Sequence, residues 1–282
     1  MKSGTILLLG ATNSGKSTLI NQIVGQRVSM VSRKKQSTTF NQKAVRNISE
    51  AEFIIQDTPG IFSAKTKISN KMTNTAFSGI DEADIVLVVV DTGVTKNNEL
   101  KKIITTLNQN NNNSKIFLVL NKIDKVNRKS VLEKIKELGD MNLFNEIFPI
   151  SALLGDGVDE MLSIIKKYLP KRKKKFSSKK TLLLKKDIYY TEVTREKIYD
   201  RTHKEIPYEC KVSTDKVVNS KKMITIHQTI HITKKSHKYI LVGNKGVNLK
   251  NIGESARKEI SKFMNKKVNL FLFVKLTSTK KS

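Results

Sequence analysis

A glycine-rich segment that begins at residue 10 most constrains what this chain can fold into. Its sequence, Gly10-Ala11-Thr12-Asn13-Ser14-Gly15-Lys16-Ser17, fits the spacing G-x-x-x-x-G-K-[ST] at every fixed position. The apolar run 6–9 precedes it as a buried strand would, and residues 17–24 have the pattern of a helix. An ordinary glycine-rich turn is the competing interpretation, but the strand-loop-helix context favours a loop that wraps phosphates with its backbone N–H groups.

The polar residues of this loop have expected roles, because nucleotide phosphates and their metal ion need cations and oxygen ligands. The Lys16 ammonium can reach the β- and γ-phosphates, and the Ser17 hydroxyl can bind Mg²⁺. The residues expected to contact phosphate come from this loop and from one later segment: Gly10, Asn13, Ser14, Gly15, Lys16, Ser17, Thr18, Asp57 and Gly60.

The later segment, Asp57-Thr58-Pro59-Gly60, directly follows the apolar run 53–56. An Asp there can hold the Mg²⁺ shell, and the Gly60 amide can sense a γ-phosphate and move when it leaves. Thr38 lies between the first helix and the second strand, where its hydroxyl can complete that shell. The expected Mg²⁺ ligands are Ser17, Thr38 and Asp57. The residues expected to act in hydrolysis are Lys16, Thr38 and Gly60.

Two further segments predict that the base is guanine. Asn121-Lys122-Ile123-Asp124 ends an apolar run, and the Asp124 carboxylate can accept two hydrogen bonds from guanine that adenine cannot supply. Lys122 can lie over the base, and Asn121 can tie this segment to the phosphate loop. Ser151-Ala152-Leu153 can offer a backbone N–H to guanine O6. The expected guanine-binding residues are Asn121, Lys122, Asp124, Ser151 and Ala152.

Strands and helices alternate up to about residue 169, which predicts an α/β domain with a mostly parallel, doubly wound sheet. Strands are expected at 5–9, 42–47, 52–56, 85–90, 115–120 and 147–150, and helices at 16–24, 99–107, 130–138 and 158–168. Several of these strands are continuously apolar, as is typical of parallel strands covered on both faces. The ligand site of such a sheet lies at the carboxyl ends of its strands.

Charge is distributed unevenly along the 282 residues. The net charge is +28, of which residues 1–170 carry +7 and residues 171–282 carry +21. Most of the excess is lysine, and solvated lysines are the plainer explanation, but the asymmetry favours a polyanionic partner for the second half. We place one domain at 1–169, a basic linker at 170–181 and a second domain at 182–282. A solvated hinge is the plainer interpretation of the linker, and contact with RNA or an anionic membrane is the alternative.

The second half has a different order of elements. A helix near 192–203, strands at 208–217 and 223–232, the loop Gly243-Asn244-Lys245-Gly246, a helix at 248–263 and a strand at 268–274 follow one another. With a helix before the loop, this is the α+β order of a type II KH domain, whose G-x-x-G loop clamps about four nucleotides. His227 and His231 could suggest a metal site, but residues four apart on a strand are separated by about 13 Å. We therefore interpret both as residues of the open face of the sheet. The expected RNA contacts are Lys238, Gly243, Asn244, Lys245, Gly246 and Lys250.

Together these motifs resemble the Era family of bacterial ribosome-assembly GTPases, most closely in residues 32–38, 151–160 and 240–260. The resemblance implies an enzyme that hydrolyses GTP, binds the 3′ end of 16S rRNA and assists assembly of the 30S subunit. Ile61 stands where Ras-like switches place a water-orienting Gln, so we expect slow hydrolysis. Similar GTPases hold K⁺ with an Asn of the phosphate loop, and Asn13 is the matching position.

Two other classes of protein fit less well. A metabolic or tRNA-modification GTPase would not need a G-x-x-G loop, and a membrane-surface switch anchored by residues 171–180 would lack an amphipathic helix or lipidation site. Cys210 is the only cysteine, and no stretch approaches the ~20 apolar residues of a membrane span. We therefore expect a cytoplasmic monomer that binds GTP or GDP with Mg²⁺ and K⁺. Peripheral contact with the inner membrane is the alternative location.

Overall fold

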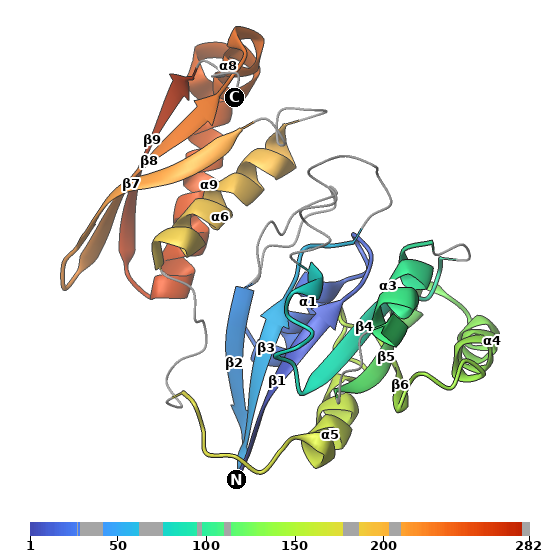
Figure 1. Cartoon of the computed structure of the whole chain (residues 1–282). Coiled ribbons are helices and arrows are strands. Elements are labelled where there is room, and N and C mark those ends of the chain that lie inside the picture. Colours follow the sequence, from blue (N-terminus) through green and yellow to red (C-terminus); the bar gives the residue numbers. More distant parts are fainter. Residues whose placement is uncertain are drawn as a thin grey trace. The chain divides into compact units, whose positions relative to one another are not determined.

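The computed structural model (Figure 1) describes residues 1–26, 28, 42–61, 76–94, 98–109, 114–176, 186–202 and 210–277. The chain divides into two compact units, residues 1–183 and 184–282. Each unit has its own sheet and its own hydrophobic core. None of the helices in the ranges above is long and apolar enough to cross a bilayer.

The first unit contains a six-stranded sheet in the order β2-β3-β1-β4-β5-β6. Its strands are β1 Lys2–Leu9, β2 Gln42–Ile48, β3 Ala51–Asp57, β4 Ile85–Asp91, β5 Lys115–Asn121 and β6 Glu146–Ile150. Strand β2 runs antiparallel to β3, and the other neighbouring pairs are parallel. The predicted α/β fold with a mostly parallel sheet is confirmed.

Helices bury both faces of this sheet. They are α1 Lys16–Val24, α3 Asn98–Gln109, α4 Arg128–Gly139 and α5 Val158–Tyr168, with a short 3₁₀ helix η1 at Ile123–Lys125. Leu9, Val88 and Leu120 pack in one cluster with the apolar sides of α3 and α4. Leu8 and Val89, which alternate with them, are equally buried. Burial on both faces explains why these strands are apolar throughout rather than alternating.

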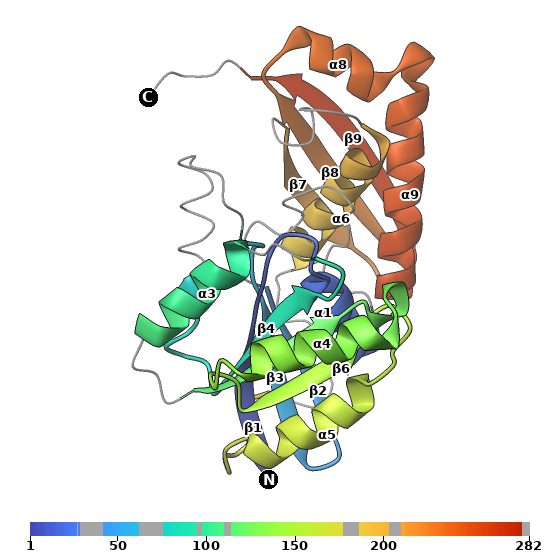
Figure 2. The ribbon, with the colours of Figure 1, turned by 90° about the vertical axis from the view of Figure 1, so that its right-hand side faces the viewer.

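The second unit follows the predicted order of a type II KH domain. Its elements are α6 Lys186–Arg201, β7 Lys211–Asn219, β8 Met223–Ile232, α8 Lys235–Val242, the 3₁₀ turn η2 Asn244–Gly246, α9 Val247–Met264 and β9 Lys267–Leu276. The sheet has the order β7-β8-β9, with β7 antiparallel and β9 parallel to β8. Helices α6 and α9 pack against each other and against this sheet (Figure 2).

One face of the second sheet is open, as the alternation in β8 predicts. Ile224, Ile226 and their partners at 230 and 232 are buried, whereas His227 is exposed and its ring stacks on Phe271 with centroids 4.9 Å apart. Phe273, also on β9, is 66% exposed. Within the described ranges, no three His, Cys, Asp or Glu side chains form a group suited to a metal ion.

The first residues of the basic segment are bonded to the first unit. The buried Glu52 carboxylate accepts hydrogen bonds from the Lys175 and Phe176 backbone N–H groups, each at 2.9 Å, and from the Ser3 hydroxyl at 2.5 Å. Arg172 forms an ion pair with Asp84 at 3.0 Å. The backbone of residues 175 and 176 is therefore bonded to the first unit, while several side chains of residues 170–176 are exposed. Residues 177–181 of the expected linker lie outside the described residues, and its role as a solvated hinge stays a prediction.

Replacing Glu52 with Ala should destabilise the first unit by about 2–4 kcal/mol, because one buried and two part-buried donors lose a charged acceptor. The matched control is Glu50→Ala, which removes an exposed carboxylate from the neighbouring turn and should change the stability by less than ~0.5 kcal/mol. Urea denaturation followed by circular dichroism measures both variants. Equal midpoints for the two would contradict this account of residues 170–176.

Candidate phosphate-binding and nucleic-acid sites

The loop between β1 and α1 packs so closely on neighbouring strands that two of its positions require glycine. A Cβ atom at Gly15 would collide with Nδ2 of Asn121, and φ of 99° places Gly15 in the left-handed region. A Cβ atom at Gly10 would collide with the Val89 carbonyl oxygen. The loop therefore lies directly on the ends of β4 and β5, which is the edge of the sheet where ligands bind in this fold.

Lys16 lies in the interior of this loop. Its Nζ donates hydrogen bonds to the carbonyl oxygens of Gly10 and Ala11, both at 2.9 Å, and the residue is 6% exposed. Burial lowers the pKa of Lys16 to about 8, although the nearby Asp57 carboxylate acts in the opposite direction. A bound phosphate would give this ammonium the strong anionic partner that two neutral carbonyls do not provide.

Ser17 and Asp57 meet beside the loop. The Ser17 hydroxyl donates a hydrogen bond to Oδ2 of Asp57 at 3.0 Å, and Asp57 is fully buried at the end of β3. A hydroxyl oxygen and a carboxylate oxygen at this spacing suit Mg²⁺, which prefers oxygen ligands. The residues present thus fit the expected ion, while the third predicted ligand, Thr38, lies outside the described residues.

The segment after Asp57 is hydrogen-bonded to the phosphate loop. The Ile61 N–H donates to the Gly10 carbonyl oxygen at 3.0 Å, and the Thr12 N–H donates to the Ile61 carbonyl oxygen at 3.1 Å. A Cβ atom at Gly60 would lie 2.8 Å from Cα of Thr12, so the contact requires glycine at this position. The Ile61 side chain is fully buried in the core, so it points away from any water that attacks a phosphate.

Asn121 joins three loops at the same edge of the sheet. Its Nδ2 donates to the Ser14 carbonyl oxygen at 2.8 Å, which is the tie to the phosphate loop that the sequence predicts. Its Oδ1 accepts hydrogen bonds from the Lys122 N–H at 2.8 Å and the Ala152 N–H at 3.0 Å. The Ala152 N–H is therefore already bonded, and guanine O6 would have to share it.

The structure brings together Asp124 and Ser151, two of the residues expected to bind guanine. The Ser151 hydroxyl donates to Oδ1 of Asp124 at 2.6 Å, and Ser151 is fully buried. The Leu154 N–H donates to the same hydroxyl at 3.2 Å. These bonds hold the Asp124 carboxylate, on the loop after β5, beside the loop after β6. Its guanine-binding role stays a prediction.

The contacts of Lys122 identify Asp91 as a residue of the site that the sequence did not predict. Its Nζ lies 2.6 Å from Oδ2 of Asp91 and donates to the Asn13 carbonyl oxygen, also at 2.6 Å. Asp91 ends β4 directly beside Asn121 in the parallel register. Asp91 could have been predicted from the sequence, because an acidic residue at the end of an apolar strand lies where the other polar segments of the site meet. This ion pair holds the Lys122 side chain across the phosphate loop.

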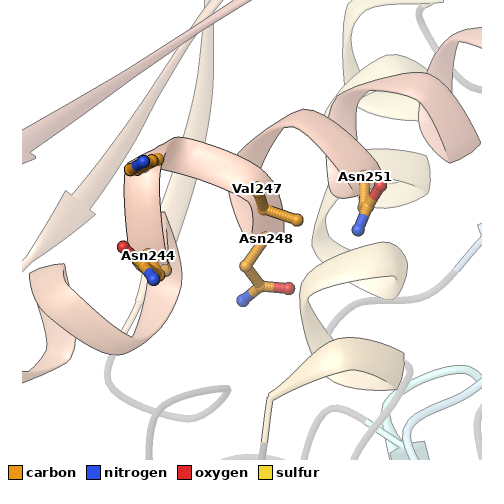
Figure 3. Close-up of a pocket in the computed structure, with 6 residues that line it drawn as sticks. Asn244, Val247, Asn248 and Asn251 are labelled. Carbon is orange, nitrogen blue, oxygen red and sulfur yellow. The ribbon is translucent and has the colours of Figure 1, made fainter.

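The G-x-x-G loop of the second unit forms an exposed hollow of about 390 Å³ (Figure 3). Its lining consists of loop residues and of the first turns of α9: Gly243, Asn244, Lys245, Val247, Asn248 and Asn251. Gly243, Lys245 and Gly246 all have φ between 49° and 80°, which turns the backbone sharply between the two helices. Asn244 and Lys245 are exposed, as a phosphate clamp requires.

The lysines expected to flank the loop lie outside the hollow, and their RNA contacts stay a prediction. Lys238 and Lys250 are exposed on α8 and α9, but neither lines the hollow. Asn248 and Asn251 do line it and were missed, and Nδ2 of Asn248 donates to the Ile240 carbonyl oxygen at 3.0 Å. Their spacing on the first turns of the helix after Gly246 could have indicated them.

The fold and the two sites define a class of protein: a P-loop GTPase domain followed by a KH domain. The family described as 50S ribosome-binding GTPase matches residues 5–122, and the KH domain family matches residues 205–280. GTPase Era of Syntrophus aciditrophicus (strain SB) is 38% identical over 98% of this chain and 90% of its own length. GTPase Era of Bradyrhizobium diazoefficiens is 37% identical over 98% and 89%. The chain belongs to the Era family.

Solved structures agree over almost the whole length. A crystal structure of Era in complex with MgGDPNP and nucleotides 1506–1542 of 16S ribosomal RNA has a TM-score of 0.92 at 32% identity, covering 99% of this chain and 95% of that one. An Aquifex aeolicus Era variant bound to GDP·AlF4⁻ has a TM-score of 0.90 at 33% identity, with the same coverage.

The lowered pKa of Lys16 predicts that nucleotide affinity depends on pH. Anionic phosphates favour the ammonium, so binding takes up a proton whenever the free protein holds the neutral amine. With a pKa of about 8, GDP affinity should fall about threefold between pH 7.5 and 8.5. Titration with a fluorescent GDP analogue measures this. The control, Lys16→Arg, stays charged and should bind with a flat profile. A flat profile in the unaltered chain would contradict the assignment.

Proposed function

We propose that this chain is a slow GTP hydrolase that binds 16S rRNA near its 3′ end and assists assembly and maturation of the 30S ribosomal subunit. The observation that carries the proposal is that one chain combines a phosphate loop tied to a guanine-type site with an exposed G-x-x-G loop. The full-length likeness to an Era complex that contains a GTP analogue and 16S rRNA supports it.

In this proposal Mg²⁺ is held by Ser17 and Asp57, with Thr38 as the third expected ligand. The ion would neutralise charge on the β- and γ-phosphates. The chain's own residues do the rest: Lys16 binds the phosphates, and Asn121 keeps the phosphate loop and the base loops in one arrangement. With its side chain buried in the core, Ile61 cannot orient the attacking water, and this supports a slow basal rate.

We further propose that Asn13 holds K⁺ beside the phosphates. Asn13 is exposed in the phosphate loop, and its φ of 65° places it in the left-handed region. Hydrolysis should be faster in K⁺ buffer than in Na⁺ buffer, and Asn13→Ala should hydrolyse GTP equally in both. Phosphate release at matched ionic strength measures the rates. Equal rates for the unaltered chain in both salts would rule out a K⁺ site.

For the domains we propose a GTPase domain at 1–169, a basic linker at 170–181 and an RNA-binding domain at 182–282, acting as a cytoplasmic monomer. The likeness of the chain to both GTPase and KH families supports this division. Contact of the linker with the inner membrane has less support, because the Lys175 and Phe176 backbone faces Glu52.

The RNA-binding half of the proposal is tested by crosslinking. Changing Asn244→Asp and Lys245→Asp together places negative charge in the loop hollow and should reduce crosslinking to 16S rRNA at least tenfold. The matched control, Asn108→Asp with Lys102→Asp on α3, makes the same change of charge at exposed positions of the first unit. GTP binding should be unaffected in both variants. Undiminished rRNA crosslinking in the loop variant would refute the clamp.

A further inference from the structure

A second hollow of the KH unit lies at the opposite end of α9 from the G-x-x-G loop. It has a volume of about 720 Å³ and is formed by the last turns of α9 and the first residues of β8 and β9. Half of its lining residues are cations and none is acidic; the cations are Arg257, Lys258, Lys262, Lys266 and Lys267. None of these residues was among the expected RNA contacts.

The positive charge of this hollow is not neutralised within the part of the chain that the structure describes. Arg257, Lys258, Lys262 and Lys267 are all exposed, and none of them forms an ion pair with a described residue. The neighbouring Glu259 carboxylate is instead paired with Lys197 of α6 at 2.6 Å. Four free cations around one depression repel each other, so an anion that enters it is attracted by all of them.

Lys266 differs from the other cations, because its hydrogen bonds fix one wall of the hollow. Its Nζ donates hydrogen bonds to Oδ1 of Asn219 at 3.1 Å and to the Ser220 carbonyl oxygen at 3.0 Å, and the Ser261 hydroxyl donates to its carbonyl oxygen at 2.6 Å. These bonds tie the end of α9 and the start of β9 to the turn after β7. The exposed cations are therefore carried by a rigid corner of the domain.

Stabilisation of the α9 dipole does not explain the whole cluster. Cations near the carboxyl end of a helix are favourable, and this accounts for Lys262 in the last turn. The effect falls off within one turn, however, and Arg257 and Lys258 lie further back. Lys267 belongs to β9 rather than to the helix.

We propose that this hollow binds the phosphodiester backbone of RNA outside the segment held by the G-x-x-G loop. The proposal rests on the proposed RNA-binding function of the domain. The lining contains no aromatic side chain on which a base could stack, and its remaining polar groups are the short side chains of Ser261, Asn265 and Asn269. Such a lining recognises phosphates and not sequence. At 1.5 Å per residue, the 18 residues of α9 are about 27 Å long, and this length is the upper limit for the separation of the two hollows along the helix.

The test compares two RNAs: a short one that fills only the G-x-x-G loop, and the same RNA extended by about 15 nucleotides to exceed that separation. The variant carries Arg257→Gln and Lys262→Gln, which keep helix propensity while they remove two charges. The control, Lys101→Gln with Lys102→Gln, removes two exposed charges from α3. Fluorescence anisotropy at several salt concentrations gives the affinities.

We expect the unaltered chain and the control to bind the extended RNA more tightly than the short one. The variant should lose most of that gain, its log-log salt slope for the extended RNA should fall by about 2, and its affinity for the short RNA should stay within twofold. The loss should not depend on the sequence of the extension. Rates of GTP hydrolysis and circular dichroism should match the unaltered chain.

Equal affinities and slopes for the variant and the unaltered chain would overturn the inference and leave the G-x-x-G clamp intact. An equal loss for both RNAs would overturn it as well, because the hollow would then not be a separate contact. Absence of any RNA binding by the unaltered chain would overturn the proposed function too. The last measurement is co-sedimentation of the protein with vesicles that contain phosphatidylglycerol. If the unaltered chain sediments with the vesicles and the variant does not, while RNA binding is the same for both, the hollow would be assigned to a membrane instead.

Discussion

The side-chain amide of Asn121 is the interaction on which the nucleotide site depends. Its two ends reach the Ser14 carbonyl oxygen on one side and the backbone N–H groups of Lys122 and Ala152 on the other. One buried residue thus fixes the phosphate loop, the loop after β5 and the loop after β6 relative to each other. A buried amide that satisfies three backbone groups cannot shift without leaving some of them unpaired, so the phosphate and base contacts are positioned together.

In the KH unit, helix α9 is the element that positions both hollows. Its first turns line the hollow at the G-x-x-G loop, and its last turns carry the exposed cations of the second hollow. Between them the helix is anchored by the fully buried Ile252, Ala256 and Ile260. A rigid rod with one anion-attracting feature at each end sets a fixed spacing between phosphates, and this spacing suits a continuous RNA strand better than a small ligand.

The sequence predicts most of this fold because the signals were local. Continuous apolar runs mark the parallel strands, and glycine spacing marks both loops. Apart from contacts within the expected nucleotide site, such as the tie from Asn121 to the phosphate loop, contacts between distant residues were not predicted. Helix α6 begins at Lys186, before the predicted Glu192, because Tyr189 is buried against Phe263 of α9 with ring centroids 4.1 Å apart. The contacts of Glu52 were likewise not predicted. Its partners at residues 175 and 176 are backbone N–H groups, and backbone groups have no sequence pattern.

The backbone pairing of Ile61 with the phosphate loop connects the proposed slow rate of GTP hydrolysis to the segment that follows Asp57. Ile61 donates a backbone hydrogen bond to the Gly10 carbonyl oxygen and accepts one from the Thr12 N–H. These two bonds require Gly60 to lie against Thr12, and they also direct the Ile61 side chain into the core. A γ-phosphate that attracts the Gly60 amide must therefore act on a segment already bonded to the loop that wraps the phosphates. The same bonds that join this segment to the phosphate loop also bury the Ile61 side chain, so the proposed slow rate and the proposed sensing of nucleotide rest on one set of contacts.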